Sequence, residues 1–255
     1  MLEMKNESEP TPEGGGISIT IAEKGPYLVY GRPPFCEQFI MPDPDNESWY
    51  FQEGKHFSTE SEPTALCRCG ASQRKPYCDG AHVRARWNPE LTASDKPLQE
   101  EAETIEGGTL RMSDNPKYCM FARFCHPYGD AWTLTEQSDD PEARRLAIRE
   151  ASMCPSGRLT AWDKQSGKPF EFHFEPSLGL IEDIAIGASG GLWLRGGIVL
   201  RRADGRTYET RNRVVVCRCG QSAYKPYCDG THAAIKWRDE LQGDPVGETL
   251  PEEVY

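Results

Sequence analysis

Two sixteen-residue stretches of the sequence carry nearly the same set of metal-binding residue types. Residues 67–82 have the sequence CRCGASQRKPYCDGAH and residues 217–232 have CRCGQSAYKPYCDGTH, with twelve of sixteen positions identical. Each stretch holds three cysteines and one histidine. Three thiolates and one imidazole are a complete set of four ligands for iron or zinc. The sequence therefore predicts at least two metal centres, and the function is argued from them.

The candidate ligands are Cys67, Cys69, Cys78 and His82 in the first copy, and Cys217, Cys219, Cys228 and His232 in the second. The first two cysteines of each copy are one residue apart, so in extended chain their side chains point the same way. Structural zinc also uses three Cys and one His, but zinc modules usually space their paired cysteines by two to four residues. Ligand chemistry alone favours iron–sulfur only slightly over zinc.

The residues between the ligands predict a loop that closes onto the start of a helix. Gly70 and Ser72 turn the chain, and Pro76 fixes a backbone angle before Cys78. Asp79 is a plausible N-cap, which places His82 in the first helical turn. Backbone N–H groups at a helix start favour negative charge, such as that of a thiolate-bound cluster.

Polar residues close to the ligands are expected to support the bound group. The serines are expected to donate hydrogen bonds to cluster sulfur, the lysines to offset its charge, and the aspartates to cap the helices. These supporting residues are Ser72, Lys75 and Asp79 in the first copy, and Ser222, Lys225 and Asp229 in the second.

Both copies resemble the CDGSH iron–sulfur (mitoNEET-like) motif, Cys-x-Cys-x2-(Ser/Thr)-x3-Pro-x-Cys-Asp-Gly-x-His. Each copy matches at every defined position, with Ala81 and Thr231 at the variable place before His. The resemblance implies one [2Fe–2S] cluster in each copy, with Cys67 and Cys69 on one iron and Cys78 and His82 on the other. The second copy would bind its cluster in the same way. Because the family is usually a homodimer, two copies in one chain imply an intramolecular pseudo-dimer and a monomeric protein.

A second type of signal lies between the copies. Cys119, Cys125 and Cys154 resemble the ligands of a bacterial ferredoxin, in which a cysteine run is paired with a distant Cys-Pro. Ala122 stands where the run would hold another ligand. The stretch from Asn115 to Leu159 resembles single-cluster ferredoxins and the divergent mono-cluster domain related to them.

That resemblance implies a third cluster, either [3Fe–4S] or a [4Fe–4S] cluster with a fourth, non-cysteine ligand. His126 is a candidate for that ligand, although its adjacency to Cys125 limits its reach. The alternative is that the three cysteines are buried structural thiols, since free cysteine often packs as a small hydrophobe.

The elements that must position these residues follow from local patterns. Strands are expected at residues 64–66 and 213–216, just before each motif, because the Val-Val-Val run of the second is strongly strand-forming. Gly25–Gly31 and Gly191–Gly196 are each an apolar strand bounded by glycines. Asp140 and Pro141 predict the start of a helix that continues to Cys154-Pro155.

We therefore expect a β-rich α+β fold in which two CDGSH-type modules flank a small ferredoxin-like insert. The predicted parts are a disordered tail at 1–16, a first module at 17–90, a mono-cluster module at 91–176, a second module at 177–243, and a tail at 244–255. The copies differ in length, and the extra residues of the first are placed within Met41–Glu62, which begins as a surface loop.

Composition narrows the class of protein. The formal net charge of −11 argues against nucleic acid or an anionic membrane as the main partner. No apolar run approaches membrane-spanning length, and closely spaced cysteines beside histidines favour metal binding in a reducing cytoplasm over disulfides.

The sequence shows no catalytic constellation, so an electron carrier that works with a redox partner protein is favoured over a substrate-transforming enzyme. The alternative is a protein that donates its clusters to an apo-acceptor or senses redox state or pH. It follows from the histidine ligands, which protonate near physiological pH and so make a cluster labile.

Overall fold

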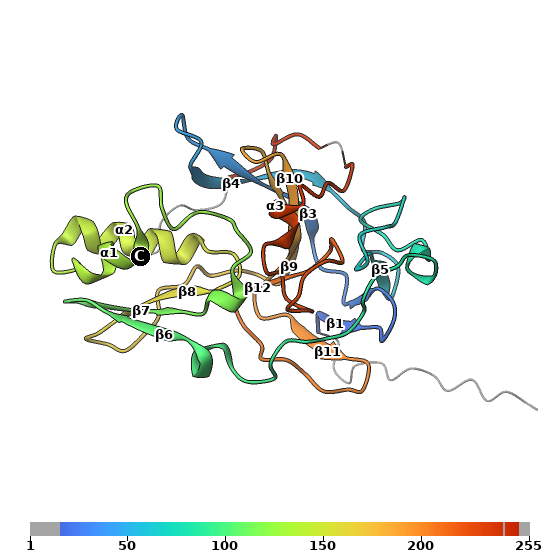
Figure 1. The fold of residues 1–255 in the computed structure, drawn as a ribbon, viewed down its shortest axis with the longest axis horizontal. Coiled ribbons are helices and arrows are strands. Elements are labelled where there is room, and N and C mark those ends of the chain that lie inside the picture. The colour runs from blue at the N-terminus through green and yellow to red at the C-terminus, as the bar shows by residue number, and fades with distance from the viewer. Residues whose placement is uncertain (1–15, 242, 250–255) are drawn as a thin grey trace, which may run out of the picture.

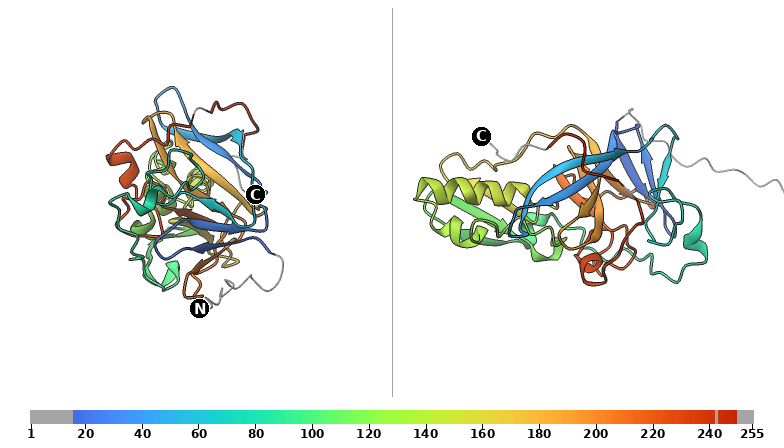
Figure 2. Two further views of the ribbon diagram at one scale, coloured as in Figure 1. Left: turned by 90° about the vertical axis from the view of Figure 1, so that its right-hand side faces the viewer. Right: turned by 90° about the horizontal axis from the view of Figure 1, so that it is seen from above.

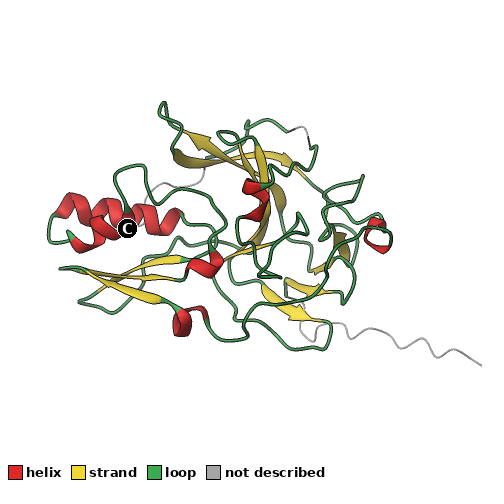
Figure 3. Ribbon diagram, viewed as in Figure 1, coloured by secondary structure: helices red, strands yellow, loops and turns green. Residues whose placement is uncertain are grey.

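The computed structural model describes residues 16–241 and 243–249, which form a sheet-rich α+β structure with few helices (Figures 1 and 3). The first half of the chain contributes β1 (Ser18–Ile21), β2 (Tyr27–Tyr30), β3 (Phe35–Pro42), β4 (Ser48–His56) and β5 (Thr64–Leu66). The last part contributes β9 (Ser177–Asp183), β10 (Ala188–Arg195), β11 (Val199–Arg202) and β12 (Arg213–Val216).

The two halves exchange strands. One sheet has the order β11-β1-β2-β5, so a strand of the last part closes a sheet of the first half. The other has the order β12-β10-β9-β3-β4, so β3 and β4 of the first half extend a sheet of the last part. Both exchanged contacts are parallel, β11 with β1 and β3 with β9, whereas the remaining pairs of these sheets are antiparallel. Strand β4 has no counterpart in the last part of the chain and lies within Met41–Glu62, where the extra residues of the first copy are predicted.

The hydrophobic core beneath these sheets belongs to both halves at once. Ile19 and Ile21 of β1 and Tyr27 of β2 are fully buried against Leu178 and Leu194 of the last part. Apolar side chains at alternate positions of a strand point to one face, which is why short β-branched strands suffice to build this shared core.

The middle of the chain folds into an α+β unit of its own. Strands β6 (Glu103–Glu106), β7 (Leu110–Asp114) and β8 (Leu159–Asp163) form an antiparallel sheet. The helices α1 (Ala131–Glu136) and α2 (Pro141–Met153) lie on one face of this sheet, at one end of the molecule (Figures 1 and 2). Asp140 accepts hydrogen bonds from the N–H groups of Glu142 and Ala143 and so caps α2, as the sequence predicts.

Four short helical turns complete the structure: η1 (Ala81–Val83), η2 (Leu98–Glu101), η3 (Pro116–Tyr118) and α3 (Thr231–Ala234). In Figure 1 and in the view from above in Figure 2, α3 lies between the helices of the middle unit and η1. No helix in the described ranges has the length and apolar character needed to cross a membrane.

The strands predicted before each motif are confirmed at their predicted bounds, as β5 and β12. The two glycine-bounded strands are also present, as β2 and within β10. Of the predicted tails, residues 1–15 and 250–255 lie outside the described residues. The rest of the C-terminal tail is not loose, because Gly247 donates to the carbonyl of Glu53 and Glu248 accepts from its N–H group. Backbone pairing with β4 thus orders a polar segment that has little apolar side-chain surface.

Candidate metal centres

The ligand residues of each motif come together as two pairs. In the first copy, the Cys67 and Cys69 sulfurs are 3.8 Å apart, and the Cys78 sulfur is 3.4 Å from Nδ1 of His82. In the second copy, the Cys217 and Cys219 sulfurs are 3.7 Å apart, and the Cys228 sulfur is 3.2 Å from Nδ1 of His232. The same imidazole nitrogen faces the neighbouring cysteine in both copies.

These distances fit two metal ions in each copy, with two protein ligands on each ion. With metal–sulfur bonds of about 2.3 Å and metal–nitrogen bonds of about 2.0 Å, two ligands of one tetrahedral ion lie about 3.8 Å (S···S) or 3.5 Å (S···N) apart. Across the described residues, no three His, Cys, Asp or Glu side chains converge on one metal position. A single zinc ion would require all four donors to converge. The arrangement therefore suits a binuclear group better than zinc.

The strand before each motif holds the two ligand pairs in place. After β5, the loop doubles back, so that Cys67 donates its N–H to the carbonyl of Pro76 and Cys78 donates to the carbonyl of Ala65. Cys217 and Cys228 make the equivalent bonds to Pro226 and Val215. Because both ligand segments bond to one strand and its continuation, the strand fixes the distance between the two pairs.

The supporting serines and lysines donate to backbone carbonyls of the loop, and the charge of Lys225 also helps to lower the pKa of Cys217. Ser72 donates its hydroxyl proton to the carbonyl of Tyr77, and Ser222 donates to that of Tyr227, both at 2.7 Å. The prediction that these hydroxyls donate to cluster sulfur is therefore wrong, because each has one proton. Lys75 and Lys225 each donate to the carbonyl of the serine three residues earlier.

The aspartates tie the loop to the turn that carries the histidine. Asp79 accepts from the N–H groups of Gln73 and Ala81, and these bonds hold the pKa of its carboxyl below its usual range. Asp229 does the same with Ala223 and Thr231. The N-cap residue is one position later than predicted, since the left-handed Gly80 and Gly230 occupy it.

The turns that follow these caps span only three and four residues. Their dipoles are correspondingly small, but the N–H groups of the N-cap residues Gly80 and Gly230 act on Cys78 and Cys228, where they oppose the rise in pKa that burial causes. Groups of the preceding loop act on Cys67 in the same sense. The hydrogen bond with Cys69, together with the N–H groups of Ser72 and Gly70, holds the pKa of Cys67 below its usual range against the effect of burial. The same hydrogen bond raises the pKa of Cys69, so one proton is shared between the two cysteines.

Two buried arginines are functional residues that the sequence analysis missed. Arg68 lies between the paired cysteines, donates to the carbonyls of Gly25 and Pro89, and stacks 4.7 Å from the Trp87 ring. Arg218 holds the same place in the second copy, stacks 5.2 Å from the Trp237 ring and pairs with Glu182 and Asp239. The signal was available, because the residue between the cysteines is Arg in both copies and each motif is followed by Trp.

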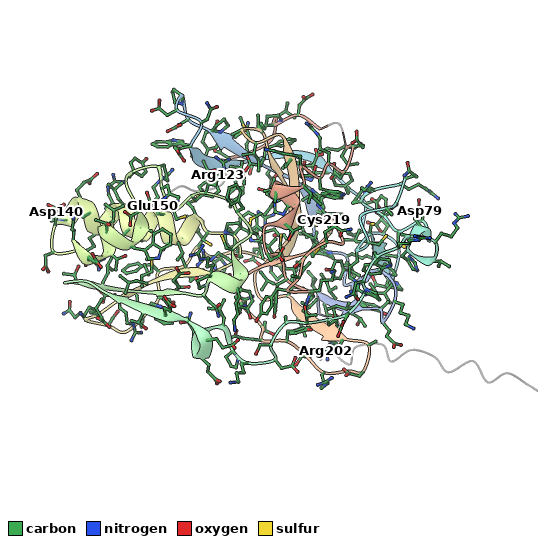
Figure 4. All side chains as sticks on the ribbon, viewed as in Figure 1. Asp79, Arg123, Asp140, Glu150, Arg202 and Cys219 are labelled. Carbon is green, nitrogen blue, oxygen red and sulfur yellow. The ribbon has the colours of Figure 1, made fainter. Side chains whose placement is uncertain are left out.

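The two copies differ in exposure. Cys228 and His232 are each 2% exposed, whereas Cys78 and His82 are only half-buried. The middle unit causes the difference, because Met120, Ala122 and Phe124 pack in one hydrophobic cluster with Cys228. Figure 4 shows Asp79, within the first motif, near the end of the molecule, and Cys219, within the second, close to its centre.

The three middle cysteines lie within electrostatic reach of one another. Cys154 caps the C-terminus of α2, and Cys125 packs with it against the core of the middle unit. Burial, and then the neighbouring Cys154 and Cys119, raise the pKa of Cys125 to about 12. Arg158, which forms an ion pair with Asp114, lies beside Cys119 and brings a positive charge to this site. His126 is exposed with its ring against Trp132.

The three candidate sites are connected by direct backbone contacts. A Cβ atom added to Gly230 would lie 3.1 Å from the carbonyl oxygen of Cys119, so the middle site touches the second motif. A Cβ atom on Gly70 would lie 2.3 Å from the carbonyl oxygen of Cys219, and one on Gly220 would lie 2.4 Å from that of Cys69. The two CDGSH-like loops therefore pack against each other reciprocally, through glycines.

Comparison with known families agrees with this division of the chain. Residues 24–83 and 189–233 match the model of the iron-binding zinc finger of CDGSH type, and residues 105–164 match the model of a divergent 4Fe-4S mono-cluster. The resemblance drawn from the motifs is thereby confirmed. No curated protein and no solved structure matches the chain.

The loop contact generates a stability prediction. Gly70 and Gly80 have similar left-handed backbones, with φ of 75° and 82°, but only Gly70 faces another backbone. Gly80→Ala should cost about 1–2 kcal/mol, the usual penalty of this conformation. Gly70→Ala should cost clearly more, because the Cys219 segment must also move. The midpoint of heat-induced loss of visible absorbance compares the two variants, and equal midpoints would contradict the contact.

The difference in burial generates a prediction for iron loss. Cys228→Ser leaves only the first motif intact, and Cys78→Ser leaves only the second. With a ferrous chelator under reducing conditions, the first site should lose its iron at least about threefold faster, because solvent reaches it without opening the core. Chelator absorbance follows the release, and faster loss from the second site would show that burial does not control it.

Proposed function

We propose that this chain, which carries two CDGSH-type iron-binding regions around a divergent 4Fe-4S mono-cluster domain, is a multi-cluster electron-transfer protein. In each CDGSH-type region a [2Fe–2S] cluster would be held by the two ligand pairs described above. Cys119, Cys125 and Cys154 would hold a third cluster, of the [3Fe–4S] or [4Fe–4S] type. Such clusters supply one-electron oxidation and reduction.

The observation that carries this proposal is the continuous contact between the three ligand sets. Cys119 of the middle site meets Gly230 beside Cys228, and the second motif meets the first through Gly70 and Gly220. Electron tunnelling falls steeply with distance, so sites held by touching backbone segments favour transfer between them. A protein that only stored or delivered clusters would not need this arrangement.

We also propose that the two CDGSH-type regions form an intramolecular pseudo-dimer. The sheets β11-β1-β2-β5 and β3-β9-β10-β12 correspond strand for strand, with each half lending one strand to the other. The Cys67 side chain lines a small cavity together with Arg218 and Trp237 of the opposite copy. The hydroxyl of Tyr27 donates to the carbonyl of Cys217. Residues of each half thus contact the candidate site of the other half. This supports a monomer whose two halves are arranged like the two subunits of a dimer.

Cluster delivery is the second candidate, and the half-buried Cys78 and His82 favour it for the first site only. The two functions differ in what leaves the protein. An electron carrier keeps its iron through repeated cycles of reduction and oxidation. A cluster donor transfers a [2Fe–2S] unit to an apo-acceptor protein and cannot be reduced again at that site. In both cases the ten cysteines, none of them in a disulfide, suit a reducing cytoplasm.

Mössbauer spectroscopy of anaerobically purified, iron-57-enriched protein tests the cluster content. We expect the quadrupole doublets of two [2Fe–2S] clusters together with iron of a cuboidal cluster. The triple variant Cys119→Ser/Cys125→Ser/Cys154→Ser should lose only the cuboidal signal, because its ligands are separate from the paired ones. Finding only [2Fe–2S] iron in the unmodified protein would remove the third cluster, and a colourless zinc protein would remove all three.

Removing the second site tests electron transfer between sites. In the unmodified protein, one electron equivalent should distribute over all clusters within a stopped-flow mixing time. In Cys228→Ser, exchange between the first and middle sites should slow by at least about tenfold, because their connection runs through the second motif. Rapid-freeze EPR measures the distribution. Cys78→Ser is the matched control and should leave exchange between the middle and second sites unchanged.

A further inference from the structure

The first CDGSH-type site lies at the surface, where a partner protein can approach it. The turn η1 carries His82 and lies near the end of the molecule opposite α1 and α2 (Figure 2). Val83, directly after the histidine, is 79% exposed, although it is apolar. The equivalent residue of the second copy, Ala233, is only 8% exposed. The first copy therefore presents an apolar side chain to solvent directly after its histidine, whereas in the second copy the exposed apolar residue, Ile235 (50% exposed), lies three positions after it.

Three arginines lie within nine residues of this exposed apolar residue along the chain. Arg74, Arg84 and Arg86 are all exposed, and within the described residues none of them forms an ion pair. Arg74 belongs to the loop that Asp79 ties to η1, and Arg84 and Arg86 directly follow η1, so all three exposed arginines belong to the chain segment around His82. We call Arg74, Val83, Arg84 and Arg86 the basic face. A surface with unpaired cations and a central apolar residue has the composition of a docking site.

The second copy has lost this face. Tyr224, Ala233 and Ala234 replace Arg74, Val83 and Arg84, so only Lys236 keeps a cation at an equivalent position. Tyr224 packs edge-on at 5.4 Å from the ring of Tyr118 in the middle unit. Its hydroxyl accepts a bond from the N–H group of Ser94. The loop position of Arg74 is thus covered by the protein's own chain in the second copy and exposed in the first, whereas the end of the histidine turn is exposed in both copies.

The local charge opposes the charge of the whole molecule. Residues 73–86 hold four basic residues and one acidic residue, whereas the chain has a formal net charge of −11. At physiological ionic strength, charges more than about 8 Å away are largely screened. The basic face, rather than the overall charge, therefore decides which protein can come close to the first site.

We propose that the basic face is the docking site for an acidic one-electron carrier protein, which exchanges electrons with the first site. This inference rests on the electron-transfer function proposed above. In the step, one electron passes from the reduced carrier to the oxidised first site, and no bond forms or breaks. The apolar Val83 fits the desolvated centre of the contact, and the arginines fit the carboxylates around it.

Charge reversal on the basic face tests the proposal in the full chain. The variant Arg84→Glu/Arg86→Glu is compared with Lys168→Glu/Lys236→Glu, which changes the total charge equally on exposed residues outside the basic face. The probe is a purified acidic plant-type ferredoxin, reduced beforehand, and stopped-flow absorbance follows its oxidation. Arg84→Lys/Arg86→Lys preserves the charge, and Arg74→Glu is a second reversal on a separate loop.

For the unmodified protein, the second-order rate constant should fall as salt is added. At low ionic strength, the basic-face reversal should lower it by about tenfold, since charge steering typically changes association rates by 10- to 1,000-fold. The control variant should change it by less than about twofold, and the lysine variant should keep most of the rate. Arg74→Glu should lower it as well. A second-order rate constant that rises with salt would overturn the proposal. So would a control variant, Lys168→Glu/Lys236→Glu, that lowers the rate constant as much as the basic-face reversal does.

The redox behaviour of the variants separates this inference from the function it rests on. If dithionite and hexacyanoferrate cycle the clusters reversibly in every variant while the ferredoxin rate ignores the basic face, the docking proposal fails and electron transfer stands. If the clusters do not cycle in the unmodified protein, the electron-transfer function itself fails. Reduction of cytochrome c, a basic carrier, should speed up in the basic-face reversal and not in the control.

Discussion

The exchange of strands between the two halves is the constraint on which the rest of the structure depends. Strand β11 closes the sheet of the first half, and β3 extends the sheet of the second, so neither half holds a complete sheet or core of its own. Exposing the apolar face of either sheet would cost about 25 cal/mol for each Å² returned to water. The halves are therefore fixed to each other, and their two ligand loops must meet at the junction.

That meeting explains why glycines and arginines accompany the ligands. Gly70 lies so close to the backbone of Cys219, and Gly220 so close to that of Cys69, that a Cβ atom at either glycine would overlap a carbonyl group of the other loop. Only glycine fits at these two positions. Arg68 and Arg218 fix the segments that carry the paired cysteines. Each arginine donates to a backbone carbonyl of a neighbouring strand or turn and stacks on a tryptophan ring. Arg68 thus anchors the loop, and its positive charge lies within electrostatic reach of Cys69 and Cys217.

The middle unit turns a nearly symmetric duplication into an asymmetric molecule. Its ligand loop packs on Gly230 and buries Cys228, and Tyr118 packs on Tyr224 and Tyr227. The second site is thereby enclosed between two neighbours, whereas the first keeps an exposed histidine turn. The same motif therefore lies in two environments, one buried and one partly exposed to solvent, so the two copies can have different roles.

Local patterns allowed much of the site to be predicted. The bounds of β5 and β12, the cap and length of α2, and the family of the motifs follow from residue types within a few positions of each other. The predictions of which partner a given side chain would hydrogen-bond were less successful. The hydroxyl of Ser72 donates to a carbonyl rather than toward the ligands, and Gly80 rather than Asp79 caps its turn. Sequence shows which groups are available, but competing partners decide their use.

The sequence by itself determined the candidate ligands, their spacing and the families that the motifs match, because these depend on covalent order and local conformation. Only the tertiary structure decided that the two halves share strands, that the Cys119 segment contacts the second motif, and that the histidine turn of the first motif is exposed. Those outcomes depend on contacts between residues more than a hundred positions apart, such as Cys119 with Gly230 and Gly70 with Cys219. No local pattern encodes them, since they arise from which apolar surfaces bury each other when the whole chain folds.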